Sequence, residues 1–214
     1  MSAVVTGMTT SVDGFVAGAD DGPDHPLGEG AGVERLFRWY EDGDTPSAYY
    51  PWMKLSAASA RFFDAFAARF GAVISGRRTY DLTHGWGGDG PLPGVPLFTL
   101  THRPPDSVPR GSSRYVFVTD GIESAVRQSI ETAGGKDVSL MGASVVQQAL
   151  RAGLVDELII SQVPVVLGRG IRLLDNLEPG TVELELADVV DARGVTHLRY
   201  RVLHEGPTRP LPPH

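Results

Sequence analysis

A regular alternation of apolar and amphipathic segments dominates this chain from residue 56 onwards. The apolar segments AVIS (72–75), PLFTL (96–100), RYVFVT (114–119), DVSLM (137–141) and ELIISQVPVV (157–166) predict strands, and most of the segments between them predict helices. Such an order is typical of an α/β sheet whose strands are mainly parallel. The last third differs, because VELELADVV and VTHLRYRVL alternate with period two around DARG. We therefore predict an α/β fold with a mostly parallel central sheet, flanked by helices and finished by a C-terminal antiparallel hairpin.

Cap residues predict where the helices begin and end. Ser56 is a plausible N-cap, Asp120 with Glu123 has the pattern of a capping box, and Ser144 precedes another amphipathic segment. Gly153 stands where a C-terminal glycine cap is expected. These positions predict helices that follow residues 56, 120 and 144.

Residues 18–52 form a long excursion from this pattern. The segment is rich in Gly and Pro, yet it also carries Trp39, Tyr40, Tyr49, Tyr50 and Trp52. Because a solvated linker seldom holds so many aromatic residues, we expect the excursion to fold back on the body, as a lid over a site would. We predict a single domain over residues 1–206 and a disordered tail over residues 207–214.

Composition excludes several classes of function. The chain has 214 residues and a net charge of −7, which does not suit binding to nucleic acid or to an anionic membrane. It has no cysteine, and its six histidines show no ligand spacing, so we predict no metal site. His197 is expected on a strand surface and His204 in the tail. With neither a signal peptide nor a long apolar run, we expect a soluble, cytoplasmic protein.

Two turns of the predicted sheet have the composition of phosphate-binding sites. The strand AVIS leads into Gly76, Arg77, Arg78 and Thr79. Glycine lets a phosphate approach the backbone closely, and arginines can donate hydrogen bonds to its oxygens. A solvated basic turn is the alternative interpretation. The second turn, Met141-Gly142-Ala143-Ser144, offers small residues and free amides, or else a plain N-cap.

Both turns follow strands that are expected to be parallel. The carboxyl ends of parallel strands share one edge of a sheet, so together the two turns indicate a dinucleotide. At a third strand end, Thr101, His102 and Arg103 suit an adenine or a ribose phosphate, although a strand running into a Pro-rich turn would look the same. Trp86, in a glycine-rich loop, either lines a pocket or anchors the loop.

Four motifs in order carry a resemblance to a known family. They are SVDGFVAG, SGRRTYD, LTHRPP and MGASVVQQALRAGLVDELIISQVPVVLGRG. Together they resemble the dihydrofolate-reductase-like superfamily, specifically the C-terminal reductase domain of the bifunctional riboflavin-biosynthesis deaminase/reductase and its stand-alone members. The resemblance covers roughly residues 2–204.

The resemblance implies NADPH-dependent reduction of a C=O or C=N bond in a small heterocyclic substrate. In that family the Gly-Arg-Arg-Thr turn meets the 2′-phosphate and pyrophosphate, which agrees with the anion argument. The resemblance assigns cofactor contacts to Thr9, Val16, Ala17, Gly76, Arg77, Arg78, Thr79, Thr101, His102, Arg103, Met141, Gly142, Ala143 and Ser144. Family members usually have Gly-Gly where this chain has Met141-Gly142.

The substrate side of the resemblance differs from true dihydrofolate reductases. Their first helix carries a carboxylate where this chain has Ser59, Ala60 and Arg61, so folate is disfavoured. The candidate proton donors are Asp13, Asp64 and Ser161. The candidate substrate contacts are Trp52, Trp86 and Gln162.

Two other classes of function stay open at this point. The chain could be a non-catalytic dinucleotide-binding module, or a flavin-dependent variant that uses the same sheet edge. Relatives commonly dimerise through the sheet, so we also expect a homodimer whose only other partner is a small-molecule substrate.

Overall fold

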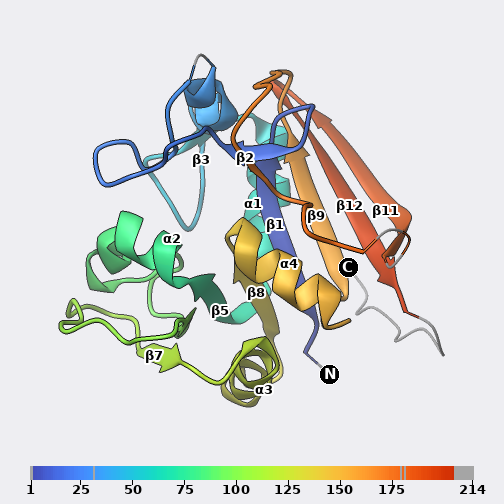
Figure 1. The fold of residues 1–214 in the computed structure, drawn as a ribbon. Helices are drawn as coiled ribbons and strands as arrows, with labels where there is room; N and C mark the ends of the chain where they lie inside the picture. Colours follow the sequence, from blue (N-terminus) through green and yellow to red (C-terminus); the bar gives the residue numbers. More distant parts are fainter. Residues whose placement is uncertain (1, 31, 179, 181, 205–214) are drawn as a thin grey trace.

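The structure, a computed structural model, describes residues 2–30, 32–178, 180 and 182–204. The predicted tail at 207–214 lies outside these residues. The central sheet has eight strands in the order β11-β12-β9-β1-β8-β5-β6-β7. All neighbours from β9 to β7 are parallel, whereas β12 pairs antiparallel with both β9 and β11. The predicted fold class, a mostly parallel sheet with a final antiparallel hairpin, is confirmed (Figure 1).

The strands of the central sheet are β1 (Val4–Thr10), β5 (Phe70–Gly76), β6 (Leu97–Leu100), β7 (Tyr115–Val118), β8 (Asp137–Met141), β9 (Glu157–Gln162), β11 (Glu183–Ala192) and β12 (Val195–Leu203). The short strands outside it are β2 (Phe15–Ala17), β3 (Thr45–Pro46), β4 (Lys54–Leu55) and β10 (Ile171–Arg172). The helices are α1 (Ala57–Ala68), α2 (Arg77–Leu82), α3 (Ile122–Thr132) and α4 (Ala143–Arg151), with 3-10 segments η1 (Val33–Tyr40) and η2 (His84–Gly88).

Alternation along the strands divides the core into two layers. On β5, Val73 packs in the layer that contains Phe70 and the aromatic residues of α1, while Ile74 points to the opposite layer. That opposite layer contains α3 and α4, so helices cover both faces of the sheet (Figure 1). Both faces of β5 and β8 are therefore buried, as a parallel sheet requires.

The predicted helix caps are partly confirmed. Ser56 is the N-cap of α1, and its hydroxyl accepts a hydrogen bond from the Ser59 amide. The predictions for Asp120 and Ser144 were wrong, because the N-caps of α3 and α4 are Gly121 and Gly142. Both glycines have positive φ, at 102° and 93°, so the sharp turn from strand to helix takes priority over a side-chain cap.

The excursion folds back on the body, as predicted. Its 3-10 segment η1 buries Leu36 and Trp39 in a cluster that also contains Val163 of the body and Val195 of β12. Asp64 of α1 secures the segment, since it accepts hydrogen bonds from the Ser47 hydroxyl at 2.6 Å and the Ala48 amide at 3.0 Å. No helix among the described residues is long and apolar enough to cross a membrane.

An ion network locks the amino-terminal edge of the sheet. Arg69 donates from Nε to Asp137 at 2.9 Å and from both Nη atoms to Glu157 at 3.0 and 2.8 Å. Burial lowers the pKa of Arg69, but these carboxylates outweigh it and leave the pKa above its usual value. Asp137 also accepts the Ala3 amide at 2.8 Å. The network thus joins the starts of β5, β8, β9 and β1.

We predict that Glu157→Gln destabilises the protein strongly. The Glu157 side chain is 1% exposed, and its loss would leave Arg69 without its bidentate partner. Breaking a buried pair from one side costs about 3 kcal/mol or more. Urea unfolding would measure this change. The control is Glu185→Gln, which breaks a half-exposed pair with Arg201 and should cost less than about 1 kcal/mol. Equal losses in the two variants would contradict this role for the network.

Candidate active site

Three polar turns leave the carboxyl edge of the sheet side by side. Ser75 at the end of β5 pairs with Met141 at the end of β8, and Gly76 pairs with Leu100 of β6. The chain enters α2 directly after Gly76 and enters α4 directly after Gly142. The turns 76–79, 101–103 and 141–144 therefore start at the same level of adjacent strands.

Gly142 brings two of these turns into contact. A Cβ atom at this position would lie 2.8 Å from the Thr79 hydroxyl oxygen, and the φ of 93° is strained for any other residue. The backbone of the 141–144 turn thus approaches the Gly-Arg-Arg-Thr turn as closely as glycine allows. Ala143 is buried and Ser144 is exposed at the start of the nine-residue helix α4. Free amides at such a helix start can bind an anion.

The two arginines of the Gly-Arg-Arg-Thr turn are held by oxygen atoms. Arg77 donates from Nε to both carboxylate oxygens of Asp81, at 2.8 and 2.9 Å, and from Nη1 to the carbonyl of Arg103. Arg78 is exposed and forms an ion pair with Asp21 of the excursion. The hydrogen bond that Arg78 donates to the Asp21 carboxylate raises the pKa of Arg78 above its usual value. Two guanidinium groups, each paired with a carboxylate, therefore stand at this edge.

The strands β1 and β8 diverge at the same edge. Their pairing ends at Thr6 and Leu140, although β1 continues beside β9 as far as Thr10 and Gln162. Thr9 lies on this extension, and its hydroxyl accepts a hydrogen bond from Trp39 Nε1 at 3.3 Å. Val16 and Ala17 lie in β2, the strand that follows β1 in the chain, and both side chains are buried. The carboxyl ends of β1 and β8 therefore lie at the same edge of the sheet but are no longer paired with each other.

Asp13 holds a turn in place. Its carboxylate accepts the Ser11 hydroxyl at 2.7 Å and the amides of Leu167 and Gly168 at 3.1 and 2.7 Å. The Ser11 hydrogen bond, aided by those amides, lowers the pKa of Asp13 to about 2. At neutral pH this carboxyl group has no proton to donate, and its contacts fit a positioning role.

Ser161 lies in a buried polar cluster that sequence reasoning missed. Its hydroxyl is 2.8 Å from Nδ1 of His197, and the Ser59 hydroxyl is 3.0 Å from Nε2 of the same ring. The expectation of His197 on a strand surface was wrong, since the residue is 0% exposed. Strand register places it opposite Ser161, where Phe62 stacks on the ring and Trp39 meets it edge-on. Burial lowers the pKa of His197 to about 4, so the ring is neutral.

The predicted substrate residues lie at different places. Trp52 is 61% exposed, and its ring lies 6.2 Å from that of Tyr40. Trp86 is half-buried in η2 with a φ of 51°, and it packs against the core layer that contains Val73 and Tyr80. Gln162 is half-buried at the end of β9. At the third turn, Thr101 is buried and bonds to the backbone of Arg103, whereas His102 and Arg103 are exposed.

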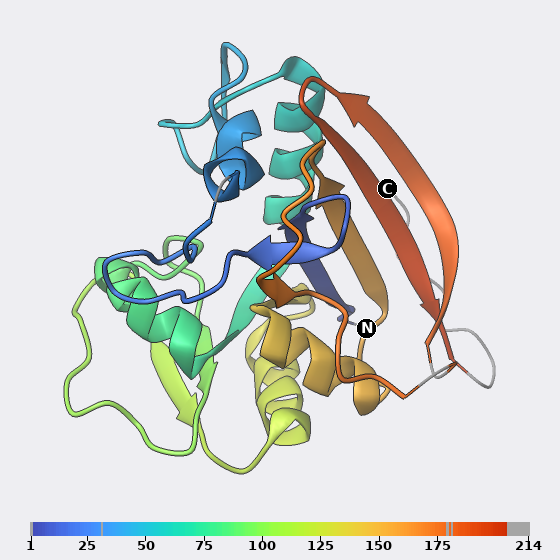
Figure 2. The same ribbon diagram turned by 45° about the horizontal axis from the view of Figure 1, so that its top comes forward.

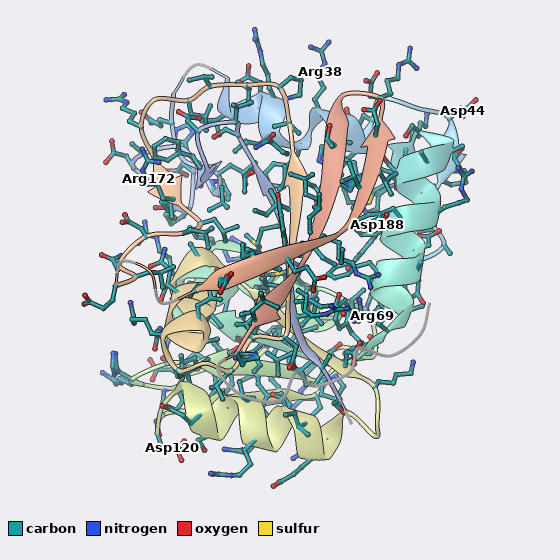
Figure 3. The ribbon with its side chains drawn as sticks, turned by 90° about the vertical axis from the view of Figure 1, so that its right-hand side faces the viewer. Arg38, Asp44, Arg69, Asp120, Arg172 and Asp188 are labelled. Atoms are coloured by element: carbon teal, nitrogen blue, oxygen red, sulfur yellow. The ribbon has the colours of Figure 1, made fainter. Side chains whose placement is uncertain are left out.

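Two cavities lie elsewhere on the molecule. The larger, about 800 Å³, separates α1 from the hairpin of β11 and β12, and its walls include Phe62, Phe66, Asp188 and Arg199. Figure 3 shows the labelled Arg69 and Asp188 between these elements. The smaller, about 490 Å³, lies at the start of α1 beside Asp42 and Arg193. Neither is lined by a predicted cofactor residue, and the described residues hold no cluster of three potential metal ligands.

Comparisons with known proteins support the family that the sequence motifs indicate. The family model of the RibD C-terminal domain matches residues 2–198. A putative riboflavin biosynthesis protein from Shewanella sp. PV-4 is 21% identical, with 95% of this chain and 100% of that chain covered and a TM-score of 0.69. A search of curated proteins found no significant match.

Two longer proteins share the fold. A deaminase/5-amino-6-(5-phosphoribosylamino)uracil reductase from Thermotoga maritima is 13% identical, with a TM-score of 0.60 over 94% of this chain and 57% of that one. RibD from Acinetobacter baumannii is 16% identical, with a TM-score of 0.61 over 95% of this chain and 59% of that one. At these identities the likeness establishes the fold.

We predict that His197 makes stability fall in mild acid. The pKa of about 4 in the folded state lies below the ordinary 6.5, so between these values the unfolded chain binds more protons. Stability is therefore fully present above pH 6.5 and is lost as the pH falls toward 4, by about 2 kcal/mol at about pH 5. Urea unfolding at about pH 7.5 and about pH 5 measures this loss. His197→Gln should lose correspondingly less, and an identical loss in the variant would contradict the assignment.

Proposed function

Because the chain belongs to the RibD C-terminal domain family, the reductase domain of riboflavin biosynthesis, we propose that it transfers hydride from NADPH to a C=O or C=N bond of a small heterocyclic substrate. The family supports an oxidoreductase. The observation that carries the choice of cofactor is the contact between Gly142 and Thr79 beside Arg77 and Arg78. Glycine at this position lets the 141–144 turn lie against Thr79, so the amides at the start of α4 stand beside the turn that carries Arg77 and Arg78, and this combination fits a phosphorylated dinucleotide.

The proposed cofactor contacts follow the three turns. Arg77, Arg78 and Thr79, after Gly76, would hold the adenosine 2′-phosphate, while Thr101, His102 and Arg103 border the adenosine. The turn of Gly142, Ala143 and Ser144 would receive the pyrophosphate at the start of α4. The residues proposed around the nicotinamide are Met141, Thr9, Val16 and Ala17.

In this proposal the side chains mainly position the cofactor and the substrate and take little part in the chemical step itself. NADPH supplies the hydride when it is bound. The chain orients it through the fixed turns and keeps water away through the buried Trp39, which the excursion places over Thr9. Trp52, Trp86 and Gln162 are the proposed substrate contacts.

The proposed source of the proton is Ser161 rather than a carboxylate. Asp13 is ionised and bonded to the amides of residues 167 and 168, and Asp64 is bonded to Ser47 and Ala48. Both therefore act as positioning residues. The Ser161 hydroxyl keeps its proton at neutral pH and is oriented by His197.

We further propose that the protein works in the cytoplasm as a homodimer assembled on the hairpin of β11 and β12. Strand register aligns Val189, Leu198 and Ile160 in one apolar row across β11, β12 and β9. Leu186 and Val189 are 55% and 49% exposed on β11, a ten-residue strand at the edge of the sheet (Figure 2). A long exposed edge of this kind invites pairing with another chain, and a second copy fits it through a two-fold axis.

The cofactor assignment predicts unequal losses in binding. Arg77→Ala and Arg78→Ala should each weaken NADPH binding by about tenfold or more, since each removes a charge-assisted contact to the 2′-phosphate. NADH binding should change much less. Fluorescence titration measures both affinities, and Arg127→Ala on the exposed side of α3 is the control. Equal losses for the two cofactors would refute the phosphate assignment.

The dimer assignment predicts a mass of twice the 22.9 kDa chain in size-exclusion chromatography with light scattering. The double variant Leu186→Lys, Val189→Lys should be monomeric, because it places two charges in the apolar face. Val166→Lys, at an exposed apolar side chain outside the hairpin, should leave the dimer intact. A wild-type protein that elutes as a monomer would contradict the proposal.

A further inference from the structure

Asp21 forms an ion pair with Arg78, one of the arginines that the proposed function assigns to the cofactor phosphate. Arg78 donates from Nε to Oδ2 of Asp21 at 2.7 Å and from Nη2 to Oδ1 at 2.6 Å, and Nη2 also reaches the Asp21 carbonyl. These parallel bonds form the bidentate fork by which a guanidinium binds either a carboxylate or a phosphate. The Asp21 side chain is 11% exposed in this position, so the contact is well covered on the carboxylate side.

The segment that carries Asp21 is an acidic loop. Its base is closed by two backbone hydrogen bonds, from Gly18 to the Leu27 carbonyl at 2.8 Å and from Glu29 to the Ala19 carbonyl at 2.7 Å. The tip between them contains Asp20, Asp21 and Asp24. Figure 2 shows this loop beside α2, the helix that starts with Arg77 and Arg78.

Of the two arginines, Arg78 is the one that pairs with Asp21. Arg77 is held by Asp81 of its own helix and by the carbonyl of Arg103, so it is fixed whatever the loop does. Arg78 is held by Asp21 through a contact that spans 57 positions in the sequence. A phosphate can take the Nε and Nη2 donors of Arg78 only by displacing the Asp21 carboxylate.

We propose that Asp21 is a specificity-determining residue that competes with the 2′-phosphate of NADPH for Arg78. This inference rests on the proposed function. A cofactor without the 2′-phosphate leaves the pair of Asp21 and Arg78 in place, whereas NADPH must break it and release the acidic loop. The carboxylate therefore reduces the preference for NADPH over NADH, and binding of the phosphate is coupled to movement of the loop.

The test removes the charge of Asp21 and keeps its shape. Asp21→Asn should bind NADPH and 2′,5′-ADP about three- to tenfold more tightly than the wild-type protein, the range expected for loss of one competing charged pair. NADH and 5′-AMP should bind within about twofold of wild type. Titration by fluorescence for the cofactors and calorimetry for the nucleotides gives these affinities without an activity assay.

Two controls isolate the competition. Asp24→Asn removes the same charge from the same tip, and no hydrogen bond or ion pair joins Asp24 to Arg78 among the described residues, so this variant should bind NADPH as the wild type does. In an Arg78→Ala background, Asp21→Asn should no longer tighten NADPH binding, because the guanidinium for which Asp21 and the phosphate compete is gone.

The outcomes separate this inference from the proposed function. If the wild type prefers NADPH and Asp21→Asn binds it no more tightly, Asp21 does not compete, while the proposed function stands. An equal gain in Asp24→Asn would also overturn the inference, since it would reduce the effect to net charge. If neither the wild type nor any variant discriminates NADPH from NADH, the proposed cofactor site fails, and this inference fails with it.

Discussion

The parallel pairing of β5 with β8 is the constraint on which the candidate site depends. It places Ser75 beside Met141, so the turns after these residues emerge next to each other. Gly142, with its positive φ and no side chain, then lets one turn rest against Thr79 of the other. A residue with a Cβ at that position would strain the backbone and force the Thr79 side chain to shift.

Contacts elsewhere in the fold hold the strands of this edge in place. At the opposite edge, Arg69 joins Asp137 of β8 to Glu157 of β9 and so fixes the starting level of the strands. On one face the excursion inserts Trp39 between Thr9 and His197, which ties the end of β1 to β12. Rigid strands thus position the turns at the edge where ligands of α/β proteins usually bind. His102, Arg103 and Ser144 are exposed there.

The sequence predicted the element order, the final hairpin and the return of the excursion, because each follows from local periodicity and aromatic content. Ser56 was recognisable as a cap, whereas Gly121 and Gly142 were not, since the path from strand to helix decides there. His197 was misjudged because its surroundings depend on the register of β12 with β9 and on Trp39 from far along the chain. No local pattern could reveal the pair of Asp21 and Arg78, which are 57 positions apart.

A crystal structure of the protein with NADPH bound would test the proposed cofactor site most directly. We expect the 2′-phosphate against Arg77 and Arg78 and the pyrophosphate at the amides of Gly142, Ala143 and Ser144. A dinucleotide seated instead in the cavity of about 800 Å³ between α1 and the hairpin would contradict it. So would a 2′-phosphate that touches neither arginine.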